Sequence, residues 1–108
     1  MIKTGYISAT TTAPSRESAE QIAETLIQKR LAACVQIVDS ITSYYWWEDS
    51  MQKDSELLII IKTTRTAVPV INRLLAQIHP YELPELIALP IEAGNPEYLE
   101  WLHRSVQA

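Results

Sequence analysis

ITSYYWWEDSMQKDSELLIIIK, residues 41–62, is the stretch that decides the fold of this 108-residue chain. Its first half ends in four consecutive aromatic residues at positions 44–47, and its second half holds an apolar run at 57–61 between Glu56 and Lys62. Aromatic and β-branched residues of this kind favour strands. We expect two strands joined as a hairpin, with the polar segment 48–54 as its tip and a return strand over residues 55–64.

A strand and a helix are expected on the N-terminal side of this stretch. Residues 5–12 are rich in Ile, Tyr and Thr, which predicts a strand. Ser15 is the expected N-cap of a helix whose apolar residues recur at positions 19, 22, 23, 26, 27 and 31. The chain is then expected to be extended from 32 to 47, and Asp39 with Ser40 marks a bulge or a bend within it.

The C-terminal side predicts a helix, a short strand and a last helix. Thr66 is the expected cap of the first of these helices, and Pro80 ends it because the residue before a proline avoids the helical region. Residues 86–91 predict a strand at a sheet edge, since Pro90 lacks a backbone donor. The last helix is expected to start at 95–97, where Asn, Pro and Glu stand in the order of a cap, a first helical residue and an early acid.

The order of these elements is β-α-β-β-α-β followed by one more helix. This order predicts an α+β fold of the ferredoxin-like type, in which two helices cover one face of an antiparallel sheet. The chain length corresponds to one domain over residues 1–108. A long hairpin between the second and third strands and the C-terminal helix are the expected additions.

The hairpin predicts an oligomer. The apolar run 57–61 does not alternate, which indicates a strand covered on both faces, whereas the two helices cover only one. A strand of roughly 15 residues spans about 50 Å, but a body of this size is about 35 Å across. The overhanging aromatic residues would expose an adhesive surface unless a neighbouring subunit covers it. The alternative is a shorter hairpin with a loop at 39–43, whose aromatic residues fold back on their own sheet.

Composition excludes several classes of protein. The net charge is −4 and only Lys29 and Arg30 are adjacent basic residues, so no basic face for nucleic acid is expected. No apolar stretch approaches the 18 residues of a membrane span. The single cysteine, Cys34, fits a reducing compartment and is expected to be a buried, inert thiol. Lys3 is not followed by an apolar signal segment, so we expect a cytoplasmic protein.

A set of residues along nearly the whole chain resembles the CutA family of divalent-cation tolerance proteins. The set comprises Ala32-Ala33-Cys34, Thr42-Ser43, Tyr45, Trp47, Glu56, Lys62-Thr63, His79-Pro80-Tyr81, Pro84-Glu85, Tyr98-Leu99 and Trp101. The resemblance implies a homotrimer with strands joined across subunits, similar in shape to the PII signalling proteins. It also implies a role in tolerance to copper and other divalent cations.

Five positions depart from the pattern of that family. Gln36 stands where many members carry Asn, 39–40 where many carry Pro-Gly, and Asp49 where many carry Gly. Thr11 stands where some members carry a cysteine linked to copper. A threonine offers no thiolate, so the soft ligand suited to Cu(I) is missing here.

His79, Glu85 and Glu56 are the candidate metal ligands. Imidazole suits copper and zinc, and the two carboxylates would complete a mixed nitrogen and oxygen site. Two structural interpretations stay open for His79: its charge complements the helix dipole, or a ring nitrogen binds a carbonyl. Glu56 has the alternative of an ion pair with Lys62 across a subunit boundary.

Lys62, Tyr81 and Trp47 are the candidates for binding a small ligand in a cleft between subunits. A PII-like sensor that binds a small anion through Lys62 and His79 in such clefts is therefore the alternative function. The structural interpretation is that Tyr81 and Trp47 pack an interface and that Lys62 extends its amine to water. His103 is expected on the surface. An enzyme is not expected, because no nucleophile or cofactor motif accompanies a possible His79–Glu85 acid–base pair.

Overall fold

The computed structural model describes residues 5–108, so the prediction about a signal segment at Lys3 lies outside the described residues. The elements follow the order β1 (Tyr6–Ala13), α1 (Arg16–Gln28), β2 (Cys34–Trp47), β3 (Ser50–Thr64), η1 (Arg65–Ala67), α2 (Val68–Ile78), β4 (Ile87–Pro90) and α3 (Pro96–Ser105). The four strands form one antiparallel sheet in the order β2-β3-β1-β4. This arrangement confirms the α+β, ferredoxin-like prediction, and Pro90 does lie on an edge strand.

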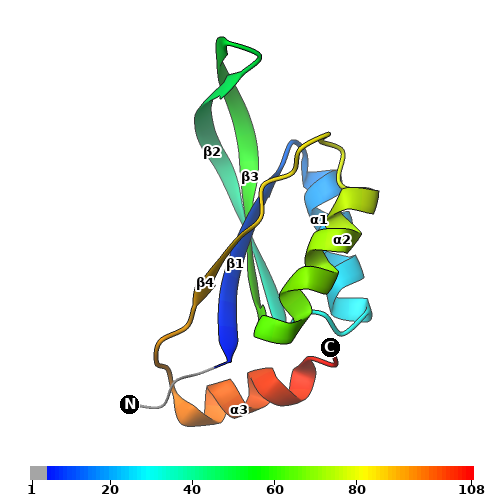
Figure 1. Ribbon diagram of the computed structural model, residues 1–108, viewed down its shortest axis with the longest axis vertical. Helices are drawn as coiled ribbons and strands as arrows, with labels where there is room; N and C mark the ends of the chain where they lie inside the picture. Colours follow the sequence, from blue (N-terminus) through cyan, green and yellow to red (C-terminus); the bar gives the residue numbers. More distant parts are fainter. Residues whose placement is uncertain (1–4) are drawn as a thin grey trace.

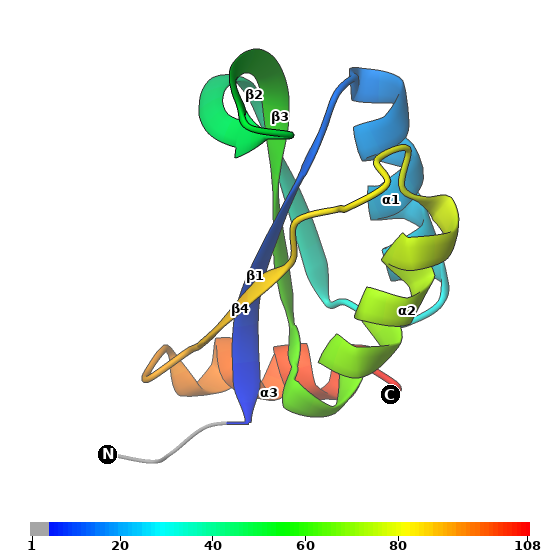
Figure 2. The ribbon, with the colours of Figure 1, turned by 45° about the horizontal axis from the view of Figure 1, so that its top comes forward.

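The molecule has two layers. Helices α1 and α2 lie together on one face of the sheet, and α3 crosses its lower end (Figures 1 and 2). The core between the layers consists mainly of Ile7, Ala9, Ala19, Ile22, Leu26, Ile59, Ile61, Ile71 and Leu75, each at most 3% exposed. Within residues 5–108 no helix is both long and apolar enough to cross a membrane.

Local capping chemistry fixes two of the three helix starts where the sequence predicts them. The Ser15 hydroxyl accepts from the backbone N–H of Ser18 at 3.1 Å, and the Ser18 hydroxyl accepts from the Ser15 N–H at 3.3 Å. Asn95 Oδ1 accepts from the N–H of Tyr98 at 2.9 Å. These bonds satisfy backbone donors that the first turn of a helix leaves unpaired.

The predicted cap at Thr66 is wrong. Thr66 lies inside the short η1 turn, and α2 begins only at Val68, with Ala67 at the N-cap position and no side-chain cap. The Thr66 hydroxyl instead donates to the backbone carbonyl of Ala108 at 2.6 Å, so it ties the end of the chain to η1.

The hairpin is longer than the polar segment suggests, and the predicted tip at 48–54 is wrong. Strand pairing reaches Trp47 and Ser50, which leaves only Glu48 and Asp49 in the turn. Both have positive φ, 51° and 61°, as a two-residue turn between strands of right-handed twist requires. The polar residues that follow belong to β3 and pair with β2, and the Lys53 amine lies over the ring of its strand partner Tyr44, 5.7 Å from the ring centroid.

The interruption at Asp39 and Ser40 is a bulge and not the end of a strand. The register between β2 and β3 shifts between Val38 and Ile41, and Ser40 has a φ of 60°. The Asp39 carboxylate pairs with Arg16 of α1. The alternative of a short hairpin with a loop at 39–43 is therefore wrong, and the hairpin extends well beyond the helices (Figure 1).

The second face of the sheet carries apolar side chains but no helix among the described residues. Ile59 and Ile61 are fully buried under the helices, whereas Leu58 and Ile60 point to the other face and are half-buried. On that same face Val38, Ile87 and Leu89 are 43%, 51% and 60% exposed. We expected both faces of β3 to be covered. Within the single chain, helices cover only one of them.

Candidate functional site

His79 ends α2 and anchors the segment that runs from this helix to β4. Its backbone is extended, with φ −72° and ψ 138°, as the following proline requires. The side chain is 8% exposed. Nε2 lies 2.6 Å from the backbone carbonyl of Thr12, and Nδ1 lies 3.0 Å from the backbone nitrogen of Tyr81.

These two contacts show which nitrogen of the His79 ring donates a hydrogen bond and which accepts one. A carbonyl can only accept, so Nε2 donates to Thr12, and Nδ1 accepts from the N–H of Tyr81. Neither ring nitrogen keeps a free lone pair for a metal ion in this arrangement. The structure therefore supports the interpretation of His79 as a side chain bound to a carbonyl, and the prediction that it is a metal ligand does not fit this geometry.

Tyr81 and Glu56 form a polar pair beside His79. The Tyr81 hydroxyl donates to Oε2 of Glu56 at 2.7 Å, and its ring lies 4.9 Å from the His79 ring. Burial, followed by this hydrogen bond to the carboxylate, raises the pKa of Tyr81. Glu56 is only 6% exposed, although its charge has no cationic partner among the described residues.

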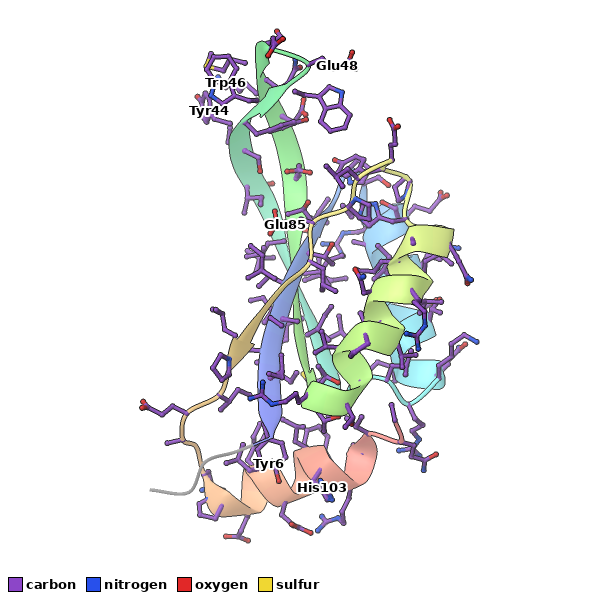
Figure 3. The ribbon with its side chains drawn as sticks, in the orientation of Figure 1. Tyr6, Tyr44, Trp46, Glu48, Glu85 and His103 are labelled. Carbon is purple, nitrogen blue, oxygen red and sulfur yellow. The ribbon has the colours of Figure 1, made fainter. Side chains whose placement is uncertain are left out.

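A pocket of about 500 Å³ lies between the hairpin and the segment after α2. Its lining is acidic and aromatic, and consists of Thr12, Tyr45, Trp46, Trp47, Glu56, Pro80, Tyr81, Glu82, Leu83 and Glu85. The structure thus brings together four of the predicted site residues, Glu56, Glu85, Tyr81 and Trp47, with His79 directly behind Tyr81. Figure 3 shows Glu85 on the segment that passes beside the sheet below the hairpin.

Sequence reasoning missed six of the ten lining residues, among them Tyr45 and Glu82. Tyr45 stands two positions before Trp47 and so faces the same side of β2, a signal that strand periodicity contains. Its hydroxyl pairs with Asp54 on β3. Glu82 lies in an irregular segment, where no periodicity tells which way a side chain points.

Lys62 lies apart from this pocket. It stands six residues from Glu56 along β3, which corresponds to about 20 Å. Its amine donates to Oε1 of Gln36 at 2.6 Å, and its strand neighbours are Cys34 and Ser8. Within one chain Lys62 therefore does not share a site with Tyr81 and Trp47, which lie toward the other end of β3; the grouping of the three residues in a cleft between subunits stays a prediction.

The remaining candidates also have definite places. Cys34 is partly exposed in the single chain, so the expectation of a buried thiol is wrong there. Thr11 is fully buried, and its hydroxyl has no hydrogen-bond partner among the described residues. His103 is exposed on α3, as expected, and stacks edge-on against Tyr6 at 6.4 Å, far from the pocket (Figure 3).

Few of the described side chains that could bind a metal ion lie close together in this structure. No three His, Cys, Asp or Glu side chains within residues 5–108 come close enough together to hold a metal ion. Of the predicted ligands, Glu56 and Glu85 face the pocket and His79 does not. A second hollow, about 820 Å³ between β1, η1 and α3, is lined by none of the predicted site residues.

Comparison with known proteins gives one consistent family. A sequence model described as CutA1 divalent ion tolerance protein matches residues 7–105. The chain is 48% identical to the divalent-cation tolerance protein CutA of Thermus thermophilus over 94 residues, which cover 87% of this chain and 91% of that protein. It is 44% identical to the mouse Protein CutA over 105 residues, which cover 96% of this chain but only 59% of the mouse protein.

Solved structures show the same fold. CutA1 from Oryza sativa has a TM-score of 0.93 and 42% identity, with 97% of this chain and 96% of that chain covered. A structure from Archaeoglobus fulgidus, described as a periplasmic divalent cation tolerance protein, has a TM-score of 0.91 and 37% identity, with 94% and 99% covered. These likenesses agree with the resemblance seen in the sequence.

Proposed function

This chain belongs to the CutA1 family of divalent ion tolerance proteins, and from that membership we propose that it acts as a homotrimer in the response to divalent cations, copper among them. We further propose that it is not an enzyme and that it works in the cytoplasm. The lone Cys34 supports a reducing compartment. Because a relative is described as periplasmic, cell fractionation is the direct check on the compartment.

The single observation that carries the trimer is the uncovered face of the sheet together with the overhanging hairpin. Val38, Ile87 and Leu89 are 43–60% exposed on that face, and Tyr44 and Trp46 are 62% and 76% exposed at the tip. Figure 3 shows Tyr44 and Trp46 on the side of the hairpin away from the helices. A monomer rarely leaves such extended apolar surface in water.

Within the described part of the chain, β2 and β4 are the two edge strands of the sheet. Head-to-tail contacts between two different edges close into a ring when the rotation between subunits allows it. The family resemblance supplies the number three. In such a ring each hairpin tip would lie against a neighbouring subunit.

Light scattering tests the assembly. The wild-type protein should have a mass of three times 12.3 kDa at micromolar concentration. Ile87→Lys with Leu89→Lys, on the uncovered face, should shift the mass toward one chain. Ile27→Lys, at a 41% exposed position on α1, is the matched control and should remain trimeric. A wild-type protein with the mass of one chain refutes the proposal.

For the cation we propose weak binding in the pocket beside His79. Glu56 and Glu85 supply the oxygen ligands there, and His79 positions Tyr81 without touching the ion. This donor set suits a hard or borderline divalent ion and lacks the thiolate that Cu(I) prefers. Two carboxylates are few ligands, which is why weak binding is expected.

Titration calorimetry with Cu²⁺ and Zn²⁺ tests the site. Glu56→Gln with Glu85→Gln should abolish the binding heat, whereas Glu24→Gln, an exposed change on α1, should leave it unchanged. His79→Ala should weaken binding through the displaced Tyr81 segment. Binding that is unaffected by the double variant, or absent from the wild type, contradicts this site.

A further inference from the structure

The pocket between the hairpin and the segment after α2 combines three features in one place. Its charged lining residues are all acidic, namely Glu56, Glu82 and Glu85. Four aromatic residues, Tyr45, Trp46, Trp47 and Tyr81, also line it. No lysine, arginine or histidine is among the lining residues that the structure describes. Such a surface repels anions and attracts cations.

Glu56 provides the point where a cation would be held. The side chain is 6% exposed, and its Oε2 accepts the only hydrogen bond, from the hydroxyl of Tyr81 at 2.7 Å. Its Oε1 has no partner among the described residues. A buried carboxylate without a positive partner is costly, so a ligand that brings a positive charge gains a strong, charge-assisted bond.

The aromatic walls select the kind of cation. Tyr45 and Trp47 face the same side of β2, and Tyr81 is held by His79 through its backbone N–H. Ring faces attract ammonium groups and also contact hydrocarbon. A divalent metal ion instead needs about four to six ligand atoms, and aromatic ring faces supply none. No group of three metal-binding side chains exists within residues 5–108.

We propose that this pocket binds a small alkylammonium ion, with the ammonium group on Glu56 and the alkyl chain against Trp47, Tyr45 and Tyr81. The pocket volume of about 500 Å³ lies in the range of small-molecule sites. This site goes beyond the proposed metal binding and does not depend on it. The ammonium group is either that of a free amine or that of a lysine side chain.

Three probes with similar hydrocarbon and different charge test the proposal. n-Butylammonium chloride, n-butanol and sodium n-butyrate are titrated at constant ionic strength and pH 7, and the indole N–H signal of Trp47 is followed by NMR. The ammonium ion should bind at least about tenfold more tightly than the alcohol, and butyrate should not bind. Equal binding of butanol and butylammonium would overturn the proposal.

Variants locate the binding. Glu56→Gln keeps an acceptor for the Tyr81 hydroxyl but removes the charge, and should weaken butylammonium binding about tenfold or more. Binding to this variant is again followed by the indole N–H signal of Trp47. Trp47→Leu, at a position 38% exposed, should also weaken butylammonium binding; the Tyr81 N–H signal reports it in this variant. Glu24→Gln should change nothing. Unchanged affinity in both pocket variants refutes the site.

Two further arms separate the sources and the two proposals. Nα-acetyl-lysine N-methylamide that binds more tightly than butylammonium assigns the ligand to a protein side chain, and weaker binding assigns it to a free amine. Trp47→Leu should leave the calorimetric heat with Zn²⁺ unchanged, because the indole is no metal ligand. A wild-type protein that binds butylammonium but not Zn²⁺ contradicts the metal site alone. A wild-type protein that binds Zn²⁺ but binds butanol as tightly as butylammonium contradicts the ammonium site alone.

Discussion

Replacing Tyr81 by phenylalanine removes one hydroxyl group and should lower the free energy of unfolding by about 2 kcal/mol. The hydroxyl donates a 2.7 Å hydrogen bond to Glu56, and this is the only hydrogen bond that the carboxylate receives within the described residues. Hydrogen bonds to charged groups contribute about 1.5–3 kcal/mol. The middle of that range applies, because Glu56 is 6% exposed while Tyr81 is half-buried.

The assay is unfolding in guanidinium chloride at pH 7, followed by far-UV circular dichroism. Protein concentration is held constant because the stability of an oligomer depends on it. Tyr44→Phe is the matched control: Tyr44 is 62% exposed and its hydroxyl bonds to none of the described residues. That control should remain within about 0.5 kcal/mol of the wild type. A Tyr81→Phe variant that also remains within this range would refute the reasoning.

The same variant should change the response to alkaline pH. Burial, followed by the hydrogen bond to Glu56, raises the pKa of Tyr81 above its ordinary value of 10. The stability from the protonated hydroxyl is therefore complete below about pH 10, where the unfolded chain ionises, and is lost as the pH rises through the folded pKa. Above about pH 10 the wild type should lose up to about 1.4 kcal/mol more per pH unit than the variant.

The slope of the variant should not fall to zero. The hydrogen bond to Asp54 also raises the pKa of Tyr45, so this second tyrosine adds to the alkaline loss in both proteins. Unfolding curves between pH 9 and 11.5 give the two slopes. Equal slopes for wild type and Tyr81→Phe would show that Tyr81 ionises alike in the folded and unfolded chain, contrary to its contact with Glu56.

Three further changes follow from the fold, each measured as a guanidinium midpoint at pH 7. Asn95→Ala removes the cap of α3 and should cost about 1 kcal/mol. Leu75→Ala in the core, at 0% exposure, should cost about 2–5 kcal/mol, whereas Leu83→Ala, at 71% exposure, should cost under about 0.5 kcal/mol. Glu48→Asn with Asp49→Gly should stabilise the hairpin by about 1 kcal/mol, since both positions have positive φ; a loss would contradict the two-residue turn.

Features that depend on neighbours in the sequence could be predicted from it. Ser15 and Asn95 cap helices because their side chains reach the N–H three residues later. Pro80 ends α2 because the residue before a proline avoids the helical region. Pro90 lies on an edge strand because its nitrogen has no hydrogen to donate. The order of helices and strands follows from such local signals, and the order of elements then leaves few folds to consider.

Features that depend on distant residues could not be predicted in the same way. Thr66 caps no helix because its hydroxyl finds the carbonyl of Ala108, 42 residues later. His79 offers no free nitrogen because Thr12, 67 residues earlier, accepts from its ring. The chemistry of the imidazole suggested a ligand, but its environment is set by a contact that the sequence around it does not contain.

The hydrogen bond between Tyr81 and Glu56 also links the segment that lines the pocket to the hairpin. Pairing between β1 and β3 ends at Ala13 and Leu57, so among residues 5–108 β3 has β2 as its only strand neighbour from Glu56 outward. Glu56 is therefore the first residue of the overhanging hairpin, and Tyr81 holds it to the segment that His79 fixes on β1. A ligand on Glu56 would act on the same bond that orients the hairpin, and the hairpin carries the surface proposed for assembly.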